Sequence, residues 1–288
     1  MIPSMAIIEL ENVSFSYQNQ AAKVLDGVSM SVGEGEIVLV CGPTGSGKTT
    51  LVRLFNGLIP HFHQGTLTGS VMIDGVDTVH TSTSKLSQIV GMVFQNPENQ
   101  LVASNCEREI AFGPENIGLP RDEIRERIES AIELVGLESI RDSPPNALSG
   151  GQKQKVAIAA ALALHPKIMV FDEPSSNLDP ESTWKLGQTI EMLSKKLHST
   201  IVIVEHRLEF FIQLATKITC MKNGRVLLNG STENVIQNDD FYSLGVQIPA
   251  FLKVFKKLSD AGLYFEPIPV DWVESKNILQ DLLPAVQP

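Results

Sequence analysis

Two glycine-rich segments of this chain carry residue types that bind phosphate. The first spans residues 42–49 and matches the phosphate-loop pattern, in which two glycines separated by four residues precede a lysine and a hydroxyl residue. Such a loop surrounds phosphate oxygens with successive backbone amides, while Lys48 adds a positive charge and the hydroxyl of Thr49 coordinates Mg²⁺. The loop lies between a predicted strand and a predicted helix, as this pattern requires. It therefore predicts a site for a nucleotide and Mg²⁺.

The second segment, residues 148–152, begins a predicted helix over residues 150–164. Ser149 and Gln152 have the spacing of a capping box. Gly150 and Gly151 leave the first backbone amides of the helix uncovered, and a bare helix N-terminus binds anions. The chain thus has two phosphate-binding surfaces but one phosphate loop, which suggests that the second surface serves a nucleotide held by another subunit.

Two adjacent carboxylates follow an apolar strand predicted over residues 167–172. In open α/β sheets ligands bind at the carboxyl ends of the strands, which is where Asp172 and Glu173 lie. We expect Asp172 to hold Mg²⁺ and Glu173 to polarise an attacking water molecule. The alternative is a solvated acidic loop after the strand.

Three further polar residues follow predicted strands and have both a chemical and a structural explanation. His206 suits a contact with the γ-phosphate, although a histidine at a strand end often has only a structural role. Gln95, taken by itself, is an ordinary polar residue at a strand end. Tyr17 suits stacking on a purine, but a single tyrosine at a strand end is more often a surface or packing residue.

The elements that position these residues form an α/β pattern with an insertion. Alternating strands are predicted at residues 7–17 and 28–32, and a continuous apolar strand at 36–41 leads into the phosphate loop and a helix over 48–56. Further strands are predicted at residues 71–75, 89–95, 200–205, 218–222 and 225–229, a helix at 181–197 and helical periodicity over about 96–164. An Asn-Gly turn joins the last two strands. Amphipathic segments after about residue 231, at 251–261 and 270–283, form a tail that we expect to dock on the core or on another subunit.

Composition narrows the class of protein. The chain has 288 residues, 43% of them hydrophobic, which suffices for one or two globular domains. A formal net charge of −10 argues against a general nucleic-acid binder, so no nucleic-acid partner is expected. The three scattered cysteines suggest reduced thiols in a cytosolic protein. Residues 1–4 lack the features of a signal peptide and no apolar run is long enough to span a bilayer, so we expect any membrane role to require a partner.

The order of the motifs resembles the ATP-binding-cassette (ABC) ATPases over residues 6 to about 230: the phosphate loop, Gln95, residues 148–152, Asp172 with Glu173, residues 176–179, and His206. The resemblance implies a RecA-like P-loop core with a parallel sheet, an antiparallel β subdomain, an inserted helical subdomain (about 96–164) and a small C-terminal helical extension. It implies an ABC domain over residues 1–235 and an extension over 236–288 that contributes dimer contacts.

The same resemblance assigns roles to residues. It implies that two subunits associate head to tail, with Glu173 as general base and His206 as the γ-phosphate contact. Thr49, Gln95 and Asp172 would bind Mg²⁺. ATP would contact one subunit through Tyr17, Gly42, Pro43, Thr44, Gly45, Ser46, Gly47, Lys48, Thr49, Thr50 and Gln95. The opposite subunit would contribute Ser149, Gly150, Gly151, Gln152 and Asp179.

Segments near residues 56–60, 69–75, 94–100, 111–116, 204–209 and 244–249 are similar to the energy-coupling-factor (ECF) ATPases. That resemblance implies ATP-driven import of a vitamin or of cobalt or nickel ions. The partners would be a second ATPase subunit, identical or a paralogue, an integral membrane transporter subunit and a substrate-binding membrane subunit, with this chain peripheral on the cytoplasmic face of the membrane. The alternatives are the ATPase of another ABC transporter type, a non-transport ABC ATPase, and a metabolic kinase, which would leave residues 149–152 unexplained.

Overall fold

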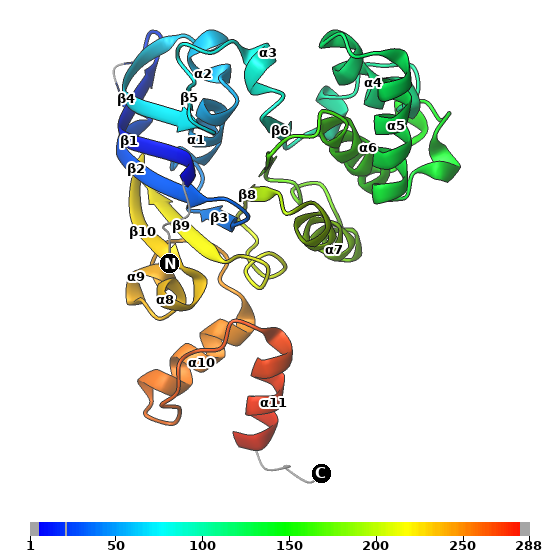
Figure 1. Cartoon of the computed structure of the whole chain (residues 1–288). Helices are drawn as coiled ribbons and strands as arrows, with labels where there is room; N and C mark the ends of the chain where they lie inside the picture. The colour runs from blue at the N-terminus through cyan, green and yellow to red at the C-terminus, as the bar shows by residue number, and fades with distance from the viewer. Residues whose placement is uncertain (1–5, 21, 283–288) are drawn as a thin grey trace.

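A mostly parallel sheet forms the centre of the computed structural model, which describes residues 6–20 and 22–282 (Figure 1). Its strand order is β10-β9-β3-β8-β7-β6. The pairs β3–β8, β3–β9, β7–β8 and β6–β7 are parallel, and only β10 pairs antiparallel, with β9. The strands are β3 (Ile37–Cys41), β6 (Val90–Val93), β7 (Ile168–Asp172), β8 (Thr200–Val204), β9 (Lys217–Lys222) and β10 (Arg225–Ser231). The expected parallel α/β core is therefore confirmed.

Both faces of this sheet are buried, which explains why its strands are continuously apolar. In β3, Leu39 and Cys41 belong to one hydrophobic cluster, whereas Val38 and Val40 belong to the other. The first cluster includes the helices of the inserted subdomain, and the second includes the helix after the phosphate loop and the antiparallel sheet. The sheet is therefore held from two sides, and its carboxyl-terminal edge is fixed in position.

The expected antiparallel sheet has the strand order β2-β1-β4-β5. Its strands are β1 (Ala6–Tyr17), β2 (Leu25–Gly33), β4 (Gly65–Ile73) and β5 (Val76–Asp77). The prediction placed the start of the third strand at residue 71, which is too late. Residues 65–70 are rich in Gly, Thr and Ser and have little apolar alternation, but they pair with β1, for example Ser70 with Glu11.

Helices α4 (Cys106–Asn116), α5 (Arg121–Val135) and α6 (Gly150–Leu162) form the inserted subdomain, which lies to one side of the sheets in Figure 1. Short 3-10 turns at Pro97–Asn99, Glu138–Ile140 and Pro145–Ala147 connect it. The remaining helices of the core are α1 (Lys48–Phe55), α2 (Leu58–His61), α3 (Thr83–Leu86) and α7 (Pro180–Leu197), of which the sequence predicted the first and the last. Asn223 and Gly224, with φ of 51° and 76°, form the predicted turn between β9 and β10.

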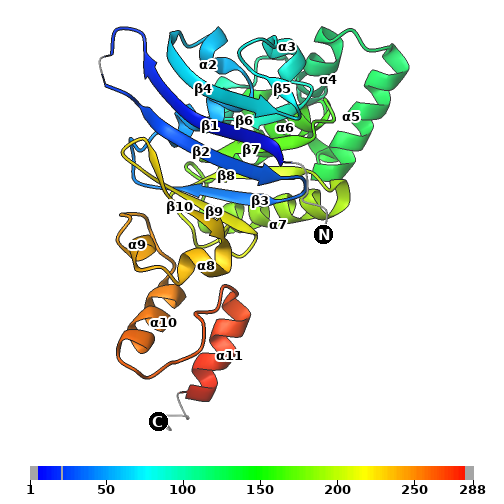
Figure 2. The same cartoon turned by 60° about the vertical axis from the view of Figure 1, so that its left-hand side comes forward.

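The C-terminal extension projects from the edge of the sheet that carries β9 and β10 (Figures 1 and 2). It contains α8 (Thr232–Ile236), α9 (Asp239–Tyr242), α10 (Ala250–Asp260) and α11 (Trp272–Leu282). Phe251, Leu252 and Phe255 of α10 are buried and continue the first hydrophobic cluster, so the extension docks on the core. The predicted boundary between residues 235 and 236 falls within α8, and the domain division stays a prediction.

Among the described residues, no helix has the length and apolar character that crossing a membrane requires. The predicted absence of a leader at residues 1–4, and residue 283 of the second amphipathic segment, lie outside the described residues.

Candidate functional site

The phosphate loop connects β3 to α1, and its first glycine packs closely against the backbone of β9. Gly42 has a φ of 154°, and a Cβ atom there would lie 2.1 Å from the carbonyl oxygen of Met221. Lys48 is buried, and its Nζ donates hydrogen bonds to the carbonyl oxygens of Gly42 (2.9 Å) and Pro43 (3.0 Å). Burial lowers the pKa of Lys48. The buried hydroxyl of Ser46 has no hydrogen-bond partner among the described residues. The loop thus presents a lysine and a hydroxyl that an anion would satisfy.

Thr49 and Asp172 form the part of the site that suits a divalent cation. The Thr49 hydroxyl donates a hydrogen bond to Asp172 Oδ1 over 3.1 Å, and Asp172 is only 3% exposed. Burial raises the pKa of Asp172 to about 6, against the opposing effect of the hydrogen bond from Thr49. A buried carboxylate that lacks a cationic partner at contact distance is costly, and Mg²⁺ prefers oxygen ligands. Together with the side-chain amide oxygen of Gln95, these groups fit Mg²⁺.

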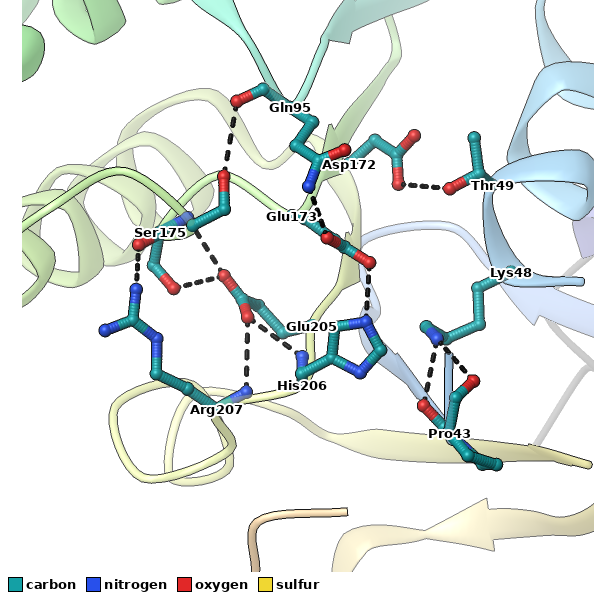
Figure 3. Close-up of polar contacts among 12 residues, drawn as sticks. Pro43, Lys48, Thr49, Gln95, Asp172, Glu173, Ser175, Glu205, His206 and Arg207 are labelled. Atoms are coloured by element: carbon teal, nitrogen blue, oxygen red, sulfur yellow. Dashed lines mark hydrogen bonds and ion pairs between the residues drawn. The ribbon is translucent and has the colours of Figure 1, made fainter. Parts of the chain in front are cut away.

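Glu173 lies between two polar side chains that come from neighbouring strands (Figure 3). Gln95 Nε2 donates a hydrogen bond to Glu173 Oε2 over 2.7 Å, and His206 Nε2 lies 2.6 Å from Glu173 Oε1. The hydrogen bond from His206 lowers the pKa of Glu173, although burial acts in the opposite direction. Glu173 also has a left-handed backbone, with φ of 49°, which is unusual for a residue with a side chain. A charged carboxylate is therefore held in one position between an amide and an imidazole.

The sheet topology explains why these residues meet. Gln95 follows β6, Glu173 follows β7, His206 follows β8, and the phosphate loop follows β3. These strands are adjacent and parallel in the order β3-β8-β7-β6, so their carboxyl ends share one edge. The backbone N–H of Glu173 donates to the carbonyl oxygen of Val204 over 2.9 Å, which extends the pairing of β7 and β8 to the site.

Residues 149–152 lie apart from this edge, at the N-terminus of α6 in the inserted subdomain (Figure 1). The predicted capping box is present: Ser149 Oγ accepts from the Gln152 N–H over 3.3 Å, and Gln152 Oε1 accepts from the Ser149 N–H over 2.9 Å. Asp179 caps α7 by accepting hydrogen bonds from the N–H (2.9 Å) and hydroxyl (2.7 Å) of Ser182. In the described part of the chain, no hydrogen bond or ion pair connects Ser149, Gln152 or Asp179 to the phosphate loop.

Tyr17 is half-buried and contacts the helix that follows the phosphate loop. Its hydroxyl lies 3.1 Å from Thr50 Oγ1, and its ring meets that of Phe15 edge to face with 4.9 Å between centroids. The side chain of Thr50 is thus turned toward Tyr17. Thr44 and Gly45 are exposed at the tip of the loop.

The sequence reasoning missed one residue of the site, Glu205. It is 2% exposed and accepts hydrogen bonds from the backbone N–H of Ser175 (2.9 Å) and of His206 (2.9 Å). The available signal was its position directly after the buried strand β8, which is the same signal that identified Asp172 and Glu173.

Comparison with known proteins identifies the family. The family model described as ABC transporter matches residues 25–176, which is more than half of the chain. The chain belongs to the ABC transporter family. The matched segment contains the phosphate loop, Gln95, residues 148–152, Asp172 and Glu173. Asp179, His206 and the C-terminal extension lie beyond it.

Two relatives illustrate how ABC proteins resemble this chain. A putative ABC transporter ATP-binding protein of Methanosarcina mazei is 39% identical over 84% of this chain, but the chain spans only 42% of the length of that relative. The energy-coupling factor transporter ATP-binding protein EcfA1 of Streptococcus pyogenes is 37% identical over 96% of this chain and 97% of its own length.

Solved ABC structures have the same fold. The structure of cbiO1 from Clostridium perfringens, described as part of the ABC transporter complex cbiONQ, aligns with a TM-score of 0.73 and 31% identity over 89% of this chain and 97% of that chain. An ATP-binding cassette solved as a dimer in a post-hydrolysis state with ADP and Pi aligns with a TM-score of 0.68 and 28% identity over 78% of this chain and 98% of that chain. The fold of an ABC ATPase is therefore confirmed.

The buried carboxyl of Asp172 gives a prediction about stability in this ABC protein. The pKa of Asp172 is higher in the folded state than in the unfolded state, so the folded state binds this proton more tightly. The stability that the bound proton gives to the folded state is present at low pH and is lost as the pH rises through about 6. Asp172→Asn keeps the acceptor for Thr49 and removes the buried charge. It is expected to stabilise the nucleotide-free chain at pH 7.5 by about 2 kcal/mol.

Urea unfolding of wild type and Asp172→Asn at several pH values checks this expectation. The gain should shrink as pH falls from 7.5 to 5, because the wild-type carboxyl then becomes neutral. Asp77→Asn, at the partly exposed end of β5, is the matched control and should show no such trend. A variant that is less stable than wild type at pH 7.5 would refute the electrostatic account of Asp172.

Proposed function

We propose that this chain hydrolyses ATP as the nucleotide-binding subunit of an ECF-type importer. The observation that carries the proposal is the placement of Glu173 between Gln95 and His206, on the same sheet edge as Lys48 and Thr49. A phosphate loop alone would bind a nucleotide, but a fixed, charged carboxylate beside it also supplies a base for water.

The chemistry follows from this arrangement. ATP binds with its phosphates in the loop of residues 42–49, where Lys48 exchanges the carbonyl oxygens of Gly42 and Pro43 for phosphate oxygens. Mg²⁺ bound by Thr49, Asp172 and Gln95 would offset negative charge on the phosphates. Glu173 accepts a proton from water as the water oxygen bonds to the γ-phosphorus and the bond to the β–γ bridging oxygen breaks, which releases ADP and phosphate.

Both oxygens of Glu173 are occupied, one by Gln95 and one by His206. Each carboxylate oxygen accepts more than one hydrogen bond, so Glu173 can receive a water molecule beside these two contacts. Gln95 is the more exposed of the two partners, and its side-chain oxygen would serve as a Mg²⁺ ligand while its Nε2 faces Glu173. His206, which lies beside Glu173, would contact the γ-phosphate of bound ATP.

A second subunit completes the site in this proposal. The capping box uses the amide of Gln152 and leaves the amides of Gly150 and Gly151 at the start of α6 free to meet phosphate oxygens of ATP held by the other chain. Asp179, exposed at the start of α7, also reaches across. Tyr17 stacks on the adenine of its own ATP. The relative solved as a dimer with ADP and Pi supports this arrangement.

The membrane partners are proposed from the relatives and from the surface. Similarity to EcfA1 and to cbiO1, named as part of cbiONQ, favours an ECF-type transporter. The resemblance of the sequence to that family implies import of a vitamin or of cobalt or nickel ions. The inserted subdomain exposes Val102 (70%) and Phe112 (52%), which suits docking to a membrane subunit on the cytoplasmic face. The extension exposes Leu263 and Phe265, which suits a contact between two ATPase subunits.

Purification of the native complex tests the proposal. The tagged full-length chain, extracted from its own membranes with detergent, is expected to bring with it an ATPase subunit and two kinds of integral membrane protein, identified by mass spectrometry. Vesicles containing that complex should accumulate one labelled vitamin or metal ion when ATP is enclosed inside them, and a complex carrying Lys48→Ala should assemble without uptake. A chain that fractionates with ribosomes or DNA and never with membrane proteins would refute the importer.

A further inference from the structure

The buried carboxylate of Glu205 connects two loops of the site. Glu205 Oε1 accepts hydrogen bonds from the backbone N–H (2.9 Å) and the hydroxyl of Ser175, in the loop after β7. Glu205 Oε2 accepts from the backbone N–H groups of His206 (2.9 Å) and Arg207 (3.3 Å), in the loop after β8. Figure 3 shows this side chain between the two loops, with Glu173 and His206 beside it. One carboxylate thus receives four hydrogen bonds from two separate segments.

Arg207 closes the same connection from the other direction. Its guanidinium donates a hydrogen bond to the carbonyl oxygen of Ser175. The two loops are therefore joined twice, once through Glu205 and once through Arg207. Arg207 also pairs with Gln247 in an isolated parallel β-bridge, which places the segment between α9 and α10 of the C-terminal extension against this loop.

The residues joined in this way are the neighbours of the proposed catalytic groups. Ser175 lies two positions after Glu173 and in the same loop as Asp179, and Glu205 immediately precedes His206. The 2.6 Å approach of His206 to Glu173 therefore depends on how the two loops are held relative to each other. Both Ser175 and Glu205 are almost fully buried, so water does not replace lost contacts easily.

We propose that Glu205 is a positioning residue for ATP hydrolysis, which holds the loop of Glu173 and the loop of His206 in register through Ser175 and Arg207. The inference depends on the proposed function, because the register matters only if Glu173 and His206 act on ATP. Glu205 itself does not contact ATP, and its effect is exerted through the Glu173–His206 pair.

Glu205→Gln is the decisive substitution, because it preserves size and keeps one acceptor oxygen while it places an amide N–H₂ opposite backbone N–H donors. It is expected to lower kcat about 30-fold, with ATP affinity of the full-length chain changed less than about 2-fold, since the phosphate loop is untouched. Ser175→Ala removes only the hydroxyl donor and is expected to lower kcat about 3-fold. This milder variant provides the test if Glu205→Gln does not fold.

A double-mutant cycle separates positioning from general loss of stability. In the His206→Ala background, Glu205→Gln should lower kcat less than about 3-fold, because the group on which it acts is gone. Glu109→Gln is the matched control: Glu109 is also buried and accepts two backbone N–H groups, of Val102 and Ala103, but in the inserted subdomain. It should lower thermal stability while kcat stays at the wild-type value.

Hydrogen exchange reports on the connection without any need for hydrolysis. Glu205→Gln should speed exchange in both residues 173–179 and residues 205–209, and Glu109→Gln in neither. If exchange changes in only one of the two segments, if kcat is unaffected, or if the 30-fold loss persists in the His206→Ala background, the positioning role is wrong. Wild-type chain that binds but does not hydrolyse ATP would instead refute the proposed function and leave the exchange result as the test of the connection.

Discussion

Glu173→Gln is expected to abolish hydrolysis, with kcat about 1,000-fold below wild type, and to trap an ATP-bound dimer. The amide oxygen of the glutamine can accept from Gln95 Nε2. Its N–H₂ can donate to His206 Nε2 when the imidazole carries its proton on Nδ1, so the geometry of the site is preserved. Only the ability to take a proton from water is lost. ATP then stays intact between the subunits. Light scattering of the full-length variant with ATP and Mg²⁺ should show a dimer, and with ADP a monomer.

Glu191→Gln is the matched control for this experiment. Glu191 lies on the exposed side of α7 and pairs with Lys195 over 2.7 Å, so the same chemical change there should leave kcat and the ATP-dependent association as in wild type. A Glu173→Gln chain that hydrolyses ATP at the wild-type rate, or that stays monomeric with bound ATP, would contradict the assignment of the base.

The sequence predicted the chemistry at the strand ends because burial and polarity change abruptly there. Each of β3, β7 and β8 is a run of fully buried residues, and a polar residue at the end of such a run, or within two residues after it, lies at the carboxyl edge of the sheet. This rule places Asp172, Glu173 and His206 on one edge, as the structure confirms. Their placement requires only the local pattern and the parallel class of the sheet.

The same rule does not predict which residues Glu205 contacts. Its partner Ser175 lies 30 residues earlier in the chain, and no local pattern specifies which loop a buried carboxylate will meet. The start of β4 was missed for a related reason: residues 65–70 have little apolar alternation and are ordered by pairing with β1, which is a long-range interaction. Sequence pattern thus predicted which residues reach the edge of the sheet, but not which of them bond to one another.

The role of Ser149 depends on an arrangement outside a single chain. Its side chain caps α6, which is a complete explanation within one subunit and is worth about 1 kcal/mol. A capping role and a role across a dimer predict different effects of the same substitution. Loss of a cap lowers stability and leaves catalysis intact, whereas a group across the interface affects hydrolysis without affecting ATP binding to the isolated chain.

Ser149→Arg is therefore expected to lower kcat at least about 100-fold while the monomer keeps wild-type affinity for ATP. The arginine places bulk and charge at the N-terminus of α6, where the second subunit's ATP would lie, and leaves the phosphate loop of its own chain unchanged. Calorimetric titration of ATP measures the affinity, and phosphate release measures kcat. Ser130→Arg, an exposed serine on α5 in the same subdomain, is the matched control and should hydrolyse ATP like wild type.

Mixing two inactive chains distinguishes the two roles most sharply. Lys48→Ala lacks a working phosphate loop but has an intact Ser149, and the Ser149→Arg chain has the opposite defect. In a head-to-tail dimer of one of each, the loop of the second chain meets Ser149 of the first, which restores one complete site. About a quarter of the wild-type activity should return in an equal mixture, since half of the dimers are mixed and each has one intact site. Activity that stays absent in the mixture, or ATP affinity that falls in the Ser149→Arg monomer, would place Ser149 within its own subunit's site and remove the argument for a shared one.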